Sequence, residues 1–428
     1  MGKKSKEKNP LPVFLQEPDG RLLTHLNACV RCGLCAESCL FYNAQPDSRN
    51  IPATKVNMVA SLYRWYSGTK GKWLSWLDGA QPLTDELLNE MEELFFGSCT
   101  LCNRCTAHCS IGVDIGYIIH HGRGILSASG KVPDEIGKSL NLALETGNNM
   151  GITAEEFRST LEWLEEDLRQ EVNDPEATIP VNRQNAEYFY TLNPRELKFF
   201  PLSISAMARI FYAAGADWTF SDRSFDITNY SFYSGDRETT VKLYNRLADE
   251  VERLGSRVCV AGECGHGARV LRWEGPEWAE RKTPFTTITS VELLARWIDE
   301  GRIRTDPSRI TEPVTLHDPC NLVRNGGIID EPRYILKNCV SSFVEMTPNR
   351  ENNICCGGGG GMLAVSRFSE ERNKAARAKV NQIKNTGAKI VVAPCHNCVD
   401  QLNQINHHYK LGIRIKTMAE IVADALVL

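Results

Sequence analysis

The chain carries three cysteine stretches in its last third: His-Asp-Pro-Cys at 317–320, Cys-Cys-Gly-Gly-Gly-Gly-Gly at 355–361 and Ala-Pro-Cys-His-Asn-Cys at 393–398. Neighbouring thiolates such as Cys355 and Cys356 can each bind an iron, and the glycines that follow allow positive φ and close approach of the backbone to a bulky group. Five thiolates are too many for one tetrahedral zinc and are typical of a cluster of several irons. Structural zinc or buried free thiols are the alternative.

Two further runs near the start of the chain share one spacing, with two, two and three residues between successive cysteines. In bacterial two-cluster ferredoxins, three thiolates of such a run bind one cluster and the fourth binds the other. The spacing predicts one [4Fe–4S] cubane on Cys29, Cys32, Cys35 and Cys109, and a second on Cys99, Cys102, Cys105 and Cys39. Leu40 and Ser110 stand where such runs usually continue with proline. A pair of zinc sites is the alternative.

The late cysteine pattern resembles the CCG domain of the D-type and B-type subunits of heterodisulfide reductases and their relatives. The cysteine spacing, the flanking Pro319 and Pro394, and the glycine run all match the pattern of that family. The resemblance implies a non-cubane [4Fe–4S] cluster on Cys320, Cys355, Cys356, Cys395 and Cys398. Overall size and a single CCG motif suggest, among these relatives, the DsrK and TmcB subunits of membrane redox complexes of sulfate reducers.

Length and composition favour a multidomain metalloprotein. A chain of 428 residues is long enough for two or three domains. Sixteen cysteines, most of them in clustered runs without a signal peptide ahead, indicate a reducing compartment and metal binding. The net charge of −4 gives no indication of nucleic-acid binding, and no apolar run is long enough to predict a membrane span. The basic start is interpreted as solvated, with anchoring at an anionic membrane surface as the alternative.

Prolines and helix caps divide the chain. Residues 1–23 are expected to form a basic flexible tail, 24–180 a helical ferredoxin-type domain with a helical insert over 50–98, and 195–428 an α/β CCG domain. In the insert, Thr84 precedes the apolar pattern of a helix over 85–96. Aromatic residues between 63 and 77 are interpreted as core, with docking onto a membrane subunit as the alternative.

From residue 196 onward β-type runs alternate with helical patterns, which predicts a domain with parallel strands and sites at their carboxyl ends. Strands are predicted at 197–200, 257–261, 314–316, 342–346 and 389–393. Helices are predicted at 203–214, 239–254, 290–300, 361–385, 396–408 and 417–426. The fold class is therefore α+β and multidomain.

An internal repeat divides the CCG domain into halves, 195–300 and 301–428, because 257–266 can be laid over 389–398. Glu263 then falls on Cys395 and His266 on Cys398, so the first half lacks its own cluster motif. We expect Glu263, Cys264 and His266 to line a pocket facing the remaining cluster, where a histidine can supply a proton. Space-filling relics are the alternative.

Three polar residues flank the cluster loops: His317, Arg324 and His396. Each is predicted either to donate a hydrogen bond to sulfur and tune the cluster or to be purely structural. The glycine run follows Cys-Cys rather than a strand, so it does not indicate a dinucleotide site.

The resemblance implies an oxidoreductase subunit with three [4Fe–4S] clusters, two cubane and one non-cubane, acting on a disulfide or trisulfide of a small molecule or small protein. It further implies a complex with a membrane cytochrome b-type subunit and multihaem cytochromes, at the cytoplasmic face of the inner membrane. The alternatives are an electron-relay subunit of a flavoprotein 2-hydroxy-acid dehydrogenase and a non-redox scaffold with structural metals.

Overall fold

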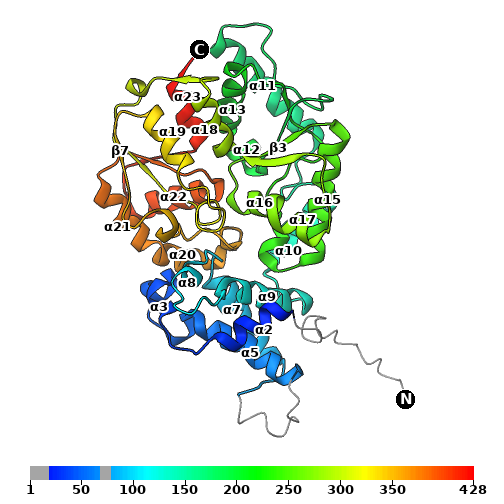
Figure 1. Cartoon of the computed structure of the whole chain (residues 1–428), viewed down its shortest axis with the longest axis vertical. Helices are drawn as coiled ribbons and strands as arrows, with labels where there is room; N and C mark the ends of the chain where they lie inside the picture. Colours follow the sequence, from blue (N-terminus) through cyan, green and yellow to red (C-terminus); the bar gives the residue numbers. More distant parts are fainter. Residues whose placement is uncertain (1–18, 68–78) are drawn as a thin grey trace.

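The chain folds into a helical N-terminal part and a larger part with two sheets, as Figure 1 shows for the computed structural model. The structure describes residues 19–67 and 79–428, so the basic start of the chain and the aromatic residues from 73 to 77 lie outside the described residues. Helix α2 (Gly20–Ala28) begins next to Asp19, whose side chain accepts the N–H of Arg21. Residues 20–23 are therefore helical and do not belong to the flexible tail expected for 1–23.

The helical part is built around amphipathic helices. Thr84 accepts the N–H of Leu87 as the N-cap of α7, and Met91 and Phe95 on one side of that helix are fully buried. This confirms the helix predicted for 85–96. The helices of this part are α2, α3 (Cys35–Ser38), α4 (Leu40–Ala44), α5 (Pro52–Ser67), α7 (Asp85–Gly97), α8 (Arg104–Ala107), α9 (Ile115–Ala128) and α10 (Asp134–Thr146), with the 3-10 turn η1 (Ser48–Asn50).

The larger part contains two four-stranded parallel sheets of the same topology. The first has the strand order β2-β1-β3-β4 and the second β7-β6-β8-β9, so strands one to four of each half take equivalent places. Strand β3 and strand β8, which carry the repeated sequences, are equivalent in this order. The two pseudo-repeated halves predicted from the sequence are therefore confirmed.

The strands are short. They are β1 (Tyr188–Tyr190), β2 (Trp218–Thr219), β3 (Val258–Ala261), β4 (Thr286–Thr289), β6 (Val314–Leu316), β7 (Phe343–Val344), β8 (Ile390–Val392) and β9 (Arg414–Lys416), with β5 (Arg304–Thr305) paired antiparallel to β10 (Leu426–Val427). The first half carries α11 (Ala154–Val172), α12 (Pro194–Phe199), α13 (Pro201–Ala213), α14 (Ser231–Ser234), α15 (Arg237–Leu254), α16 (Gly265–Arg269), the π-turn η3 (Val270–Glu274), α17 (Gly275–Trp278) and α18 (Ser290–Asp299). The second half carries α19 (Glu331–Cys339), α20 (Ser369–Ala375), α21 (Arg377–Thr386), α22 (His396–Tyr409) and α23 (Met418–Ala425), with 3-10 turns η4 (Pro307–Arg309), η5 (Arg350–Asn352), η6 (Met362–Ala364) and η7 (Ser366–Phe368).

Two of the predicted elements are wrong. The strand expected at 197–200 is the end of α12, which Asn193 and Glu196 start with a reciprocal capping box and Pro194 at the first turn. The helix expected over 361–385 is broken into η6, η7, α20 and α21. Gly361, at φ 82°, precedes the first of these turns.

The boundary between the parts differs from the expected one. Phe157 and Leu164, on the buried side of α11, share a core with Phe211 of α13 rather than with the cysteine-bearing helices. Strand β1 at 188–190 also precedes the expected start at 195. Helix α11 therefore belongs to the first sheet half, although the sequence grouped it with the ferredoxin-type domain.

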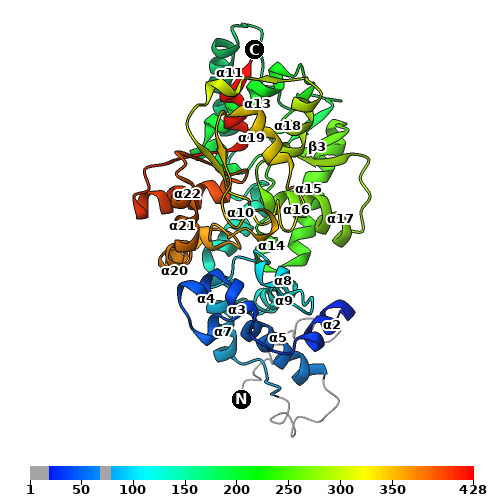
Figure 2. The same ribbon diagram turned by 60° about the vertical axis from the view of Figure 1, so that its left-hand side comes forward.

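The parts pack as one body. One hydrophobic core joins Met91 and Phe95 of α7 to Val391 of β8 and Leu402 of α22, and a second joins Val260 of β3 to Val392 of β8. In Figure 2, α9 lies directly below α14, and α4 lies below α20. The helical part therefore contacts both sheet halves at the side where the cysteine loops emerge.

Candidate metal centres

The five CCG cysteines converge at the carboxyl ends of parallel strands of the second sheet. Strand β6 leads to Cys320, and β8 leads to Cys395, which is the N-cap of α22. All five thiols are buried, and the Sγ atoms of Cys356 and Cys398 lie 3.3 Å apart. Cys355 hydrogen-bonds to Cys320. The structure thus brings together the five residues that the sequence singled out.

The glycine run is required by close backbone approach. A Cβ atom on Gly358 would lie 2.7 Å from Cβ of Gln401, and one on Gly360 would lie 2.9 Å from the backbone of Thr100. Gly360 also has φ 63°, a region that glycine adopts without strain. The N–H groups of Gly357 and Gly358 donate to Sγ of Cys355 and Cys356, each at 3.4 Å. The run therefore lets the loop pass between α22 and the segment that carries Thr100, while its amides face sulfur.

Hydrogen bonding among the thiols favours ionisation of three of them, and contacts from Cys102 and Cys320 lower the pKa of Cys355. Contacts from Cys355 and Cys398 lower the pKa of Cys356 well below its usual value, and the contact from Cys398 lowers the pKa of Cys395 to about 6. The positive end of α22 adds to this effect. Because the thiolate is the form that binds metal, this buried set of soft donors fits an iron–sulfur group.

Orphaned polar atoms surround the same loops. Within the part of the chain that the structure describes, neither ring nitrogen of His317 has a hydrogen-bond partner, nor do Oδ1 of Asn397 and the side-chain amide of Gln401. Each of these side chains is at least nine-tenths buried. A buried polar group without a partner costs about 1–3 kcal/mol. Such a concentration at one place is what a site built around a further group would leave.

The two ferredoxin-type runs adopt the same turns. Arg31 and Leu101, at equivalent places, have φ of 58° and 54°, and Gly33 and Asn103 have φ of 83° and 58°. Left-handed backbone is unfavourable for a leucine or an arginine, and it is repeated here in both runs. Matching strain at matching positions fits loops that wrap around a similar group, as the shared spacing predicts.

Electrostatic contacts link Cys39 to the second run. Burial, partly opposed by the ammonium of Lys55, raises the pKa of Cys39, and the thiols of Cys102 and Cys99 add to the rise. The pKa of Cys35 is instead raised first by burial and then by the thiols of Cys29 and Cys32. This fits the crossed arrangement in which Cys39 joins Cys99, Cys102 and Cys105. The crossed partner Cys109, whose Sγ accepts the N–H of Val113 at 3.4 Å, stays a prediction.

The second run and the CCG loop touch. The hydroxyl of Thr100 lies 3.6 Å from Sγ of Cys355, and the Cys102 thiol hydrogen-bonds to Cys355, which raises the pKa of Cys102. Arg324 donates to the carbonyl of Cys102 at 2.7 Å. Two sets of cysteines from opposite ends of the chain therefore meet at Cys102 and Cys355.

Arg123 fastens this junction. Its fully buried guanidinium donates to the carbonyls of Phe95, Cys99, Tyr233 and Gly360 at distances between 2.7 and 3.1 Å. These four acceptors belong to the helical part, the first sheet half and the CCG loop. One side chain thus holds all three regions together.

The loop of the first half faces the CCG site. A Cβ atom on Gly265 would lie 3.2 Å from the amide of Leu322, which follows Cys320 closely. After burial, the thiols of Cys264 and Cys395 and, less strongly, Cys320 raise the pKa of Tyr233. Tyr233 therefore lies in the field of cysteines from both halves.

The three candidate catalytic residues in that loop have different surroundings. The carboxylate of Glu263 accepts the N–H groups of Met418 and Ala419 at 3.0 and 2.7 Å, so it caps the start of α23. Nδ1 of His266 lies 3.4 Å from Sγ of Cys264, and its Nε2 bonds to the carbonyl of Thr228. Burial lowers the pKa of His266 to about 4, so this ring is neutral at neutral pH.

The three flanking residues also differ. Arg324 is occupied by carbonyl groups, and Nε2 of His396 lies 3.2 Å from the carboxylate of Glu196. Burial opposes protonation of His396, yet Glu196 raises the pKa of His396 to about 9. His317 directly follows β6, and one of its ring nitrogens lies within 4.8 Å of the Sγ atoms of Cys356 and Cys398.

Sequence reasoning did not place two buried lysines near the cysteines; it considered Lys55 only for docking on a membrane subunit, and burial of Lys55 argues against that use. Lys379 and Lys55 are 1% exposed. Burial lowers the pKa of Lys379 to about 8, opposed by Asp318 and the CCG thiols, and Lys55 acts on the pKa of both Cys39 and Cys99. Each lies on the apolar side of its helix, next to Val380 and Val56 respectively. A lysine on an apolar helix face was the available signal, and the charges of both lysines interact with those of nearby thiolates.

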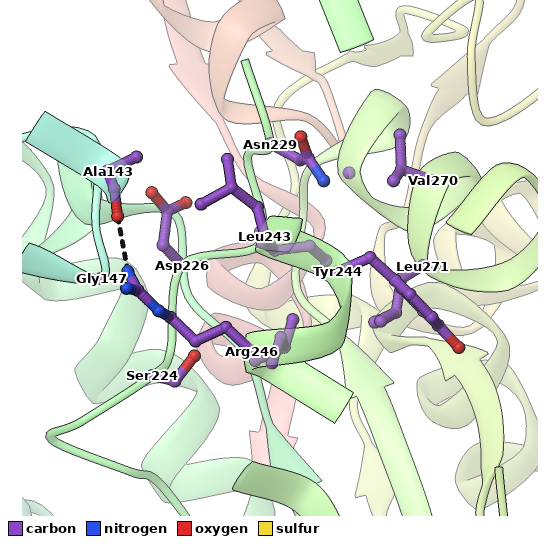
Figure 3. A pocket seen from close by; sticks show the side chains of 13 residues that line it. Ala143, Gly147, Ser224, Asp226, Asn229, Leu243, Tyr244, Arg246, Val270 and Leu271 are labelled. Atoms are coloured by element: carbon purple, nitrogen blue, oxygen red, sulfur yellow. Dashed lines mark hydrogen bonds between the residues drawn. The ribbon is translucent and has the colours of Figure 1, made fainter. Parts of the chain in front are cut away.

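The cavities of the described residues differ in size. The one in Figure 3, lined by Asp226 and Tyr244 and crossed by the bond from Arg246 to Ala143, has about 20 Å³, which is space for about one water. A cavity of about 270 Å³ lies beside the CCG site, because Asn397 between Cys395 and Cys398 lines it together with Tyr230 of the first half. A third, of about 390 Å³, borders Leu101 and Asn103 on the other side of the second run.

Comparisons with known proteins agree with this two-part arrangement. The family model described as a 4Fe-4S dicluster domain matches residues 25–113, and the one described as a cysteine-rich (CCG) domain matches 314–403. The chain is 28% identical to an Hdr-like menaquinol oxidoreductase iron-sulfur subunit of Archaeoglobus profundus, over 94% of the chain and 80% of that protein. It is 26% identical to the D-type subunit of a dihydromethanophenazine:CoB–CoM heterodisulfide reductase of Methanosarcina barkeri, over 94% and 95%. It is 23% identical to an EtfAB:quinone oxidoreductase of Syntrophomonas wolfei, over 89% and 55%.

The helical part with its paired cysteine runs, the CCG loops and the relatives' names agree on an iron–sulfur oxidoreductase subunit. None of the described helices is long and apolar enough to cross a membrane. The chain joins a region that matches a 4Fe-4S dicluster domain to one that matches a cysteine-rich CCG domain, and over 94% of its length it is similar to Hdr-like iron–sulfur subunits and to D-type subunits of heterodisulfide reductase.

Proposed function

We propose that this chain is the electron-transfer and catalytic iron–sulfur subunit of a membrane-associated respiratory redox complex that acts on a disulfide- or trisulfide-type substrate. The two ferredoxin-type cysteine sets would hold [4Fe–4S] cubanes, and the five CCG cysteines a third, non-cubane cluster. When bound, these groups supply one-electron redox chemistry. The observation that carries the proposal is the contact of Thr100 and Cys102 with Cys355.

That contact supports a relay that ends at the CCG site. The second ferredoxin-type set adjoins the CCG cysteines without an intervening layer of side chains at Cys102 and Cys355, and Arg123 fixes the two loops to each other. Short separation between redox groups is what sequential electron transfer requires. The protein's own contribution is this fixed geometry, together with the lysines that offset the charge of the cysteine sets.

The cavity beside Asn397 and Tyr230 is proposed to admit the substrate. Its volume of about 270 Å³ suits a small molecule or a single side chain carrying a disulfide. Reduction of a disulfide takes two electrons and two protons and breaks the S–S bond to give two thiols. Cys264 and His266 do not line this cavity; both are buried, and the thiol of Cys264 lies in the field of Cys395. They are therefore proposed to act behind the CCG loop, whereas Glu263 is proposed to position their loop through α23.

Partner subunits are proposed to connect the chain to the membrane. Two of the relatives carry menaquinol or quinone oxidoreductase in their names, which supports an electron carrier of the lipid phase at the other end of the relay. A cytochrome b-type membrane subunit and multihaem cytochromes, implied by the resemblance, would supply that end at the cytoplasmic face of the membrane. If the natural complex purifies with haem b, this assignment is supported. If it purifies with a flavoprotein instead, the chain is a relay subunit of a 2-hydroxy-acid dehydrogenase.

An activity assay tests the catalytic part. Oxidation of reduced methyl viologen is followed anaerobically after addition of a small dialkyl disulfide or trisulfide to wild type and to Cys356→Ala. The matched control is Cys339→Ala, because Cys339 is also a buried free cysteine but lies in α19 and bonds to Thr305. The proposal requires that Cys356→Ala lose the activity and that Cys339→Ala keep it. Equal activity in all three proteins would refute a catalytic CCG site.

A further inference from the structure

His317 occupies a fixed position at the edge of the CCG site. The backbone N–H of His317 donates to the carbonyl of Val392 at 2.8 Å, so the pairing of β6 with β8 continues to this residue. The side chain is 0% exposed. Backbone pairing and burial therefore hold this residue beside the cysteine loops.

The ring has no partner for either nitrogen among the described residues. The neighbouring charged groups are already engaged. The carboxylate of Asp318 receives both Nη atoms of Arg333 at 2.9 Å and the N–H of Arg350 at 2.7 Å. Nζ of Lys379 lies 3.5 Å from Sδ of Met346. The guanidinium of Arg324 is likewise bound to carbonyl groups of Cys102, Glu351 and Asn353. An imidazole left wholly unpaired in a core costs about 1–3 kcal/mol for each polar atom, so the site has a strong reason to supply one more partner.

The sulfurs near the ring identify that partner. A nitrogen of His317 and the Sγ atoms of Cys356 and Cys398 all lie within 4.8 Å of one another. Donors that bind one metal at about 2.0–2.3 Å are separated by roughly 4.6 Å at most, so these three atoms are close to the spacing of ligands on a single ion.

We propose that His317 is a sixth protein donor of the CCG site, with an imidazole nitrogen bound to the same iron as Cys356 and Cys398. Imidazole is a suitable ligand for iron, and histidine replaces cysteine on one iron of Rieske centres. The inference rests on the proposed CCG cluster, and it adds a non-cysteine ligand that the cysteine spacing does not indicate.

Pulsed EPR on protein labelled with ¹⁵N-histidine tests the assignment. The measurement is made on the paramagnetic CCG signal of the purified, iron-loaded chain. A directly bonded imidazole gives a strong histidine-nitrogen coupling that changes isotopically on labelling. We expect this coupling in wild type and its loss in His317→Ala. His317→Cys offers a replacement donor, and we expect that variant to keep the iron while losing the nitrogen coupling.

The matched control is His120→Gln. His120 is also buried, but it lies in α9 of the helical part, and its Nε2 bonds to the carbonyl of Phe232 at 2.8 Å. This variant should keep the coupling unchanged. A CCG signal with full iron content and no strong histidine coupling in wild type would overturn the ligand assignment and leave the proposed function standing. A wild-type protein that carries no iron beyond the two ferredoxin-type sets would overturn both.

Discussion

Replacing Arg123 by methionine should loosen the junction between the helical part and the CCG loop. The guanidinium is fully buried and donates to four carbonyl oxygens, those of Phe95, Cys99, Tyr233 and Gly360. Its plane also lies 4.4 Å from the ring centre of Phe96. Methionine fills much of the same volume and can donate to none of these oxygens.

The size of the expected destabilisation follows from the four carbonyl oxygens that lose their hydrogen-bond donor. Each buried acceptor that loses its donor costs about 1–3 kcal/mol, and relief of the buried guanidinium charge offsets part of the sum. We therefore expect a loss on the order of 5 kcal/mol in the free energy of unfolding, a large share of the roughly 5–15 kcal/mol that stabilises a typical domain.

The assay compares three variants by anaerobic urea unfolding of the cluster-loaded protein. Arg367→Met is the control, because the side chain of Arg367 is 50% exposed and pairs with Glu92 at 2.5 Å, a type of contact worth about 0–1 kcal/mol. Arg123→Lys keeps the charge with fewer donors and should fall between wild type and Arg123→Met. If Arg123→Met shifts the unfolding midpoint no more than Arg367→Met does, the guanidinium does not hold the junction and the reasoning is refuted.

Three other predictions concern the site and its surroundings. Thr100→Val removes the hydroxyl 3.6 Å from Sγ of Cys355 at nearly constant volume; we expect unchanged iron content and a shifted CCG midpoint potential in an EPR redox titration, and an unchanged potential would contradict the contact. Asn397→Ala, which enlarges the 270 Å³ cavity, should raise KM for a small disulfide more than it lowers kcat, whereas a loss of iron would show a structural role instead. Burial raises the pKa of Asp226 from 3.8 to about 6, so the folded state holds a proton that the unfolded state has lost between these values, and this carboxyl should lower the free energy of unfolding by on the order of 3 kcal/mol as pH rises from about 4 to 6. The difference in unfolding midpoint between wild type and Asp226→Asn should therefore change between pH 5 and pH 7, and a constant difference would contradict the assigned cause.

Cysteine spacing predicted the parts of the molecule that short-range chemistry determines. The shared spacing of the early runs anticipated two matching loops, and Arg31 and Leu101 indeed share one unusual backbone conformation. The repeat around β3 and β8 anticipated two sheets of equal strand order. Both features depend on short stretches of sequence, so they could be predicted without knowledge of the tertiary packing.

Other features depend on distant contacts. Strands β2 and β7 have only two residues each, too few for a periodic signal, and the strands buried on both faces show no polar alternation. Helix α11 has a clear capping box, yet nothing local tells which core its apolar side joins. Thr100 and Cys355 lie far apart in sequence, and their contact follows only from the packing of complete domains.

Among the buried polar groups, too, some could be predicted from local sequence and others depend on distant contacts. Lys379 could have been noticed as a lysine on an apolar helix face, because its position relative to Val380 and Ile383 follows from helical periodicity. The lack of a hydrogen-bond partner for the His317 ring among the described residues could not have been predicted, because it depends on Asp318 and Lys379 being engaged elsewhere.

The most direct test of the central claim is a measurement of iron and acid-labile sulfide, with EPR of the oxidised, thiol-treated protein, on wild type and Cys356→Ser. The account predicts about twelve irons per wild-type chain, as three four-iron clusters require, and a paramagnetic signal that Cys356→Ser abolishes. About eight irons in both proteins, with no such signal and with viologen-linked disulfide reduction intact in the variant, would contradict a redox-active CCG centre.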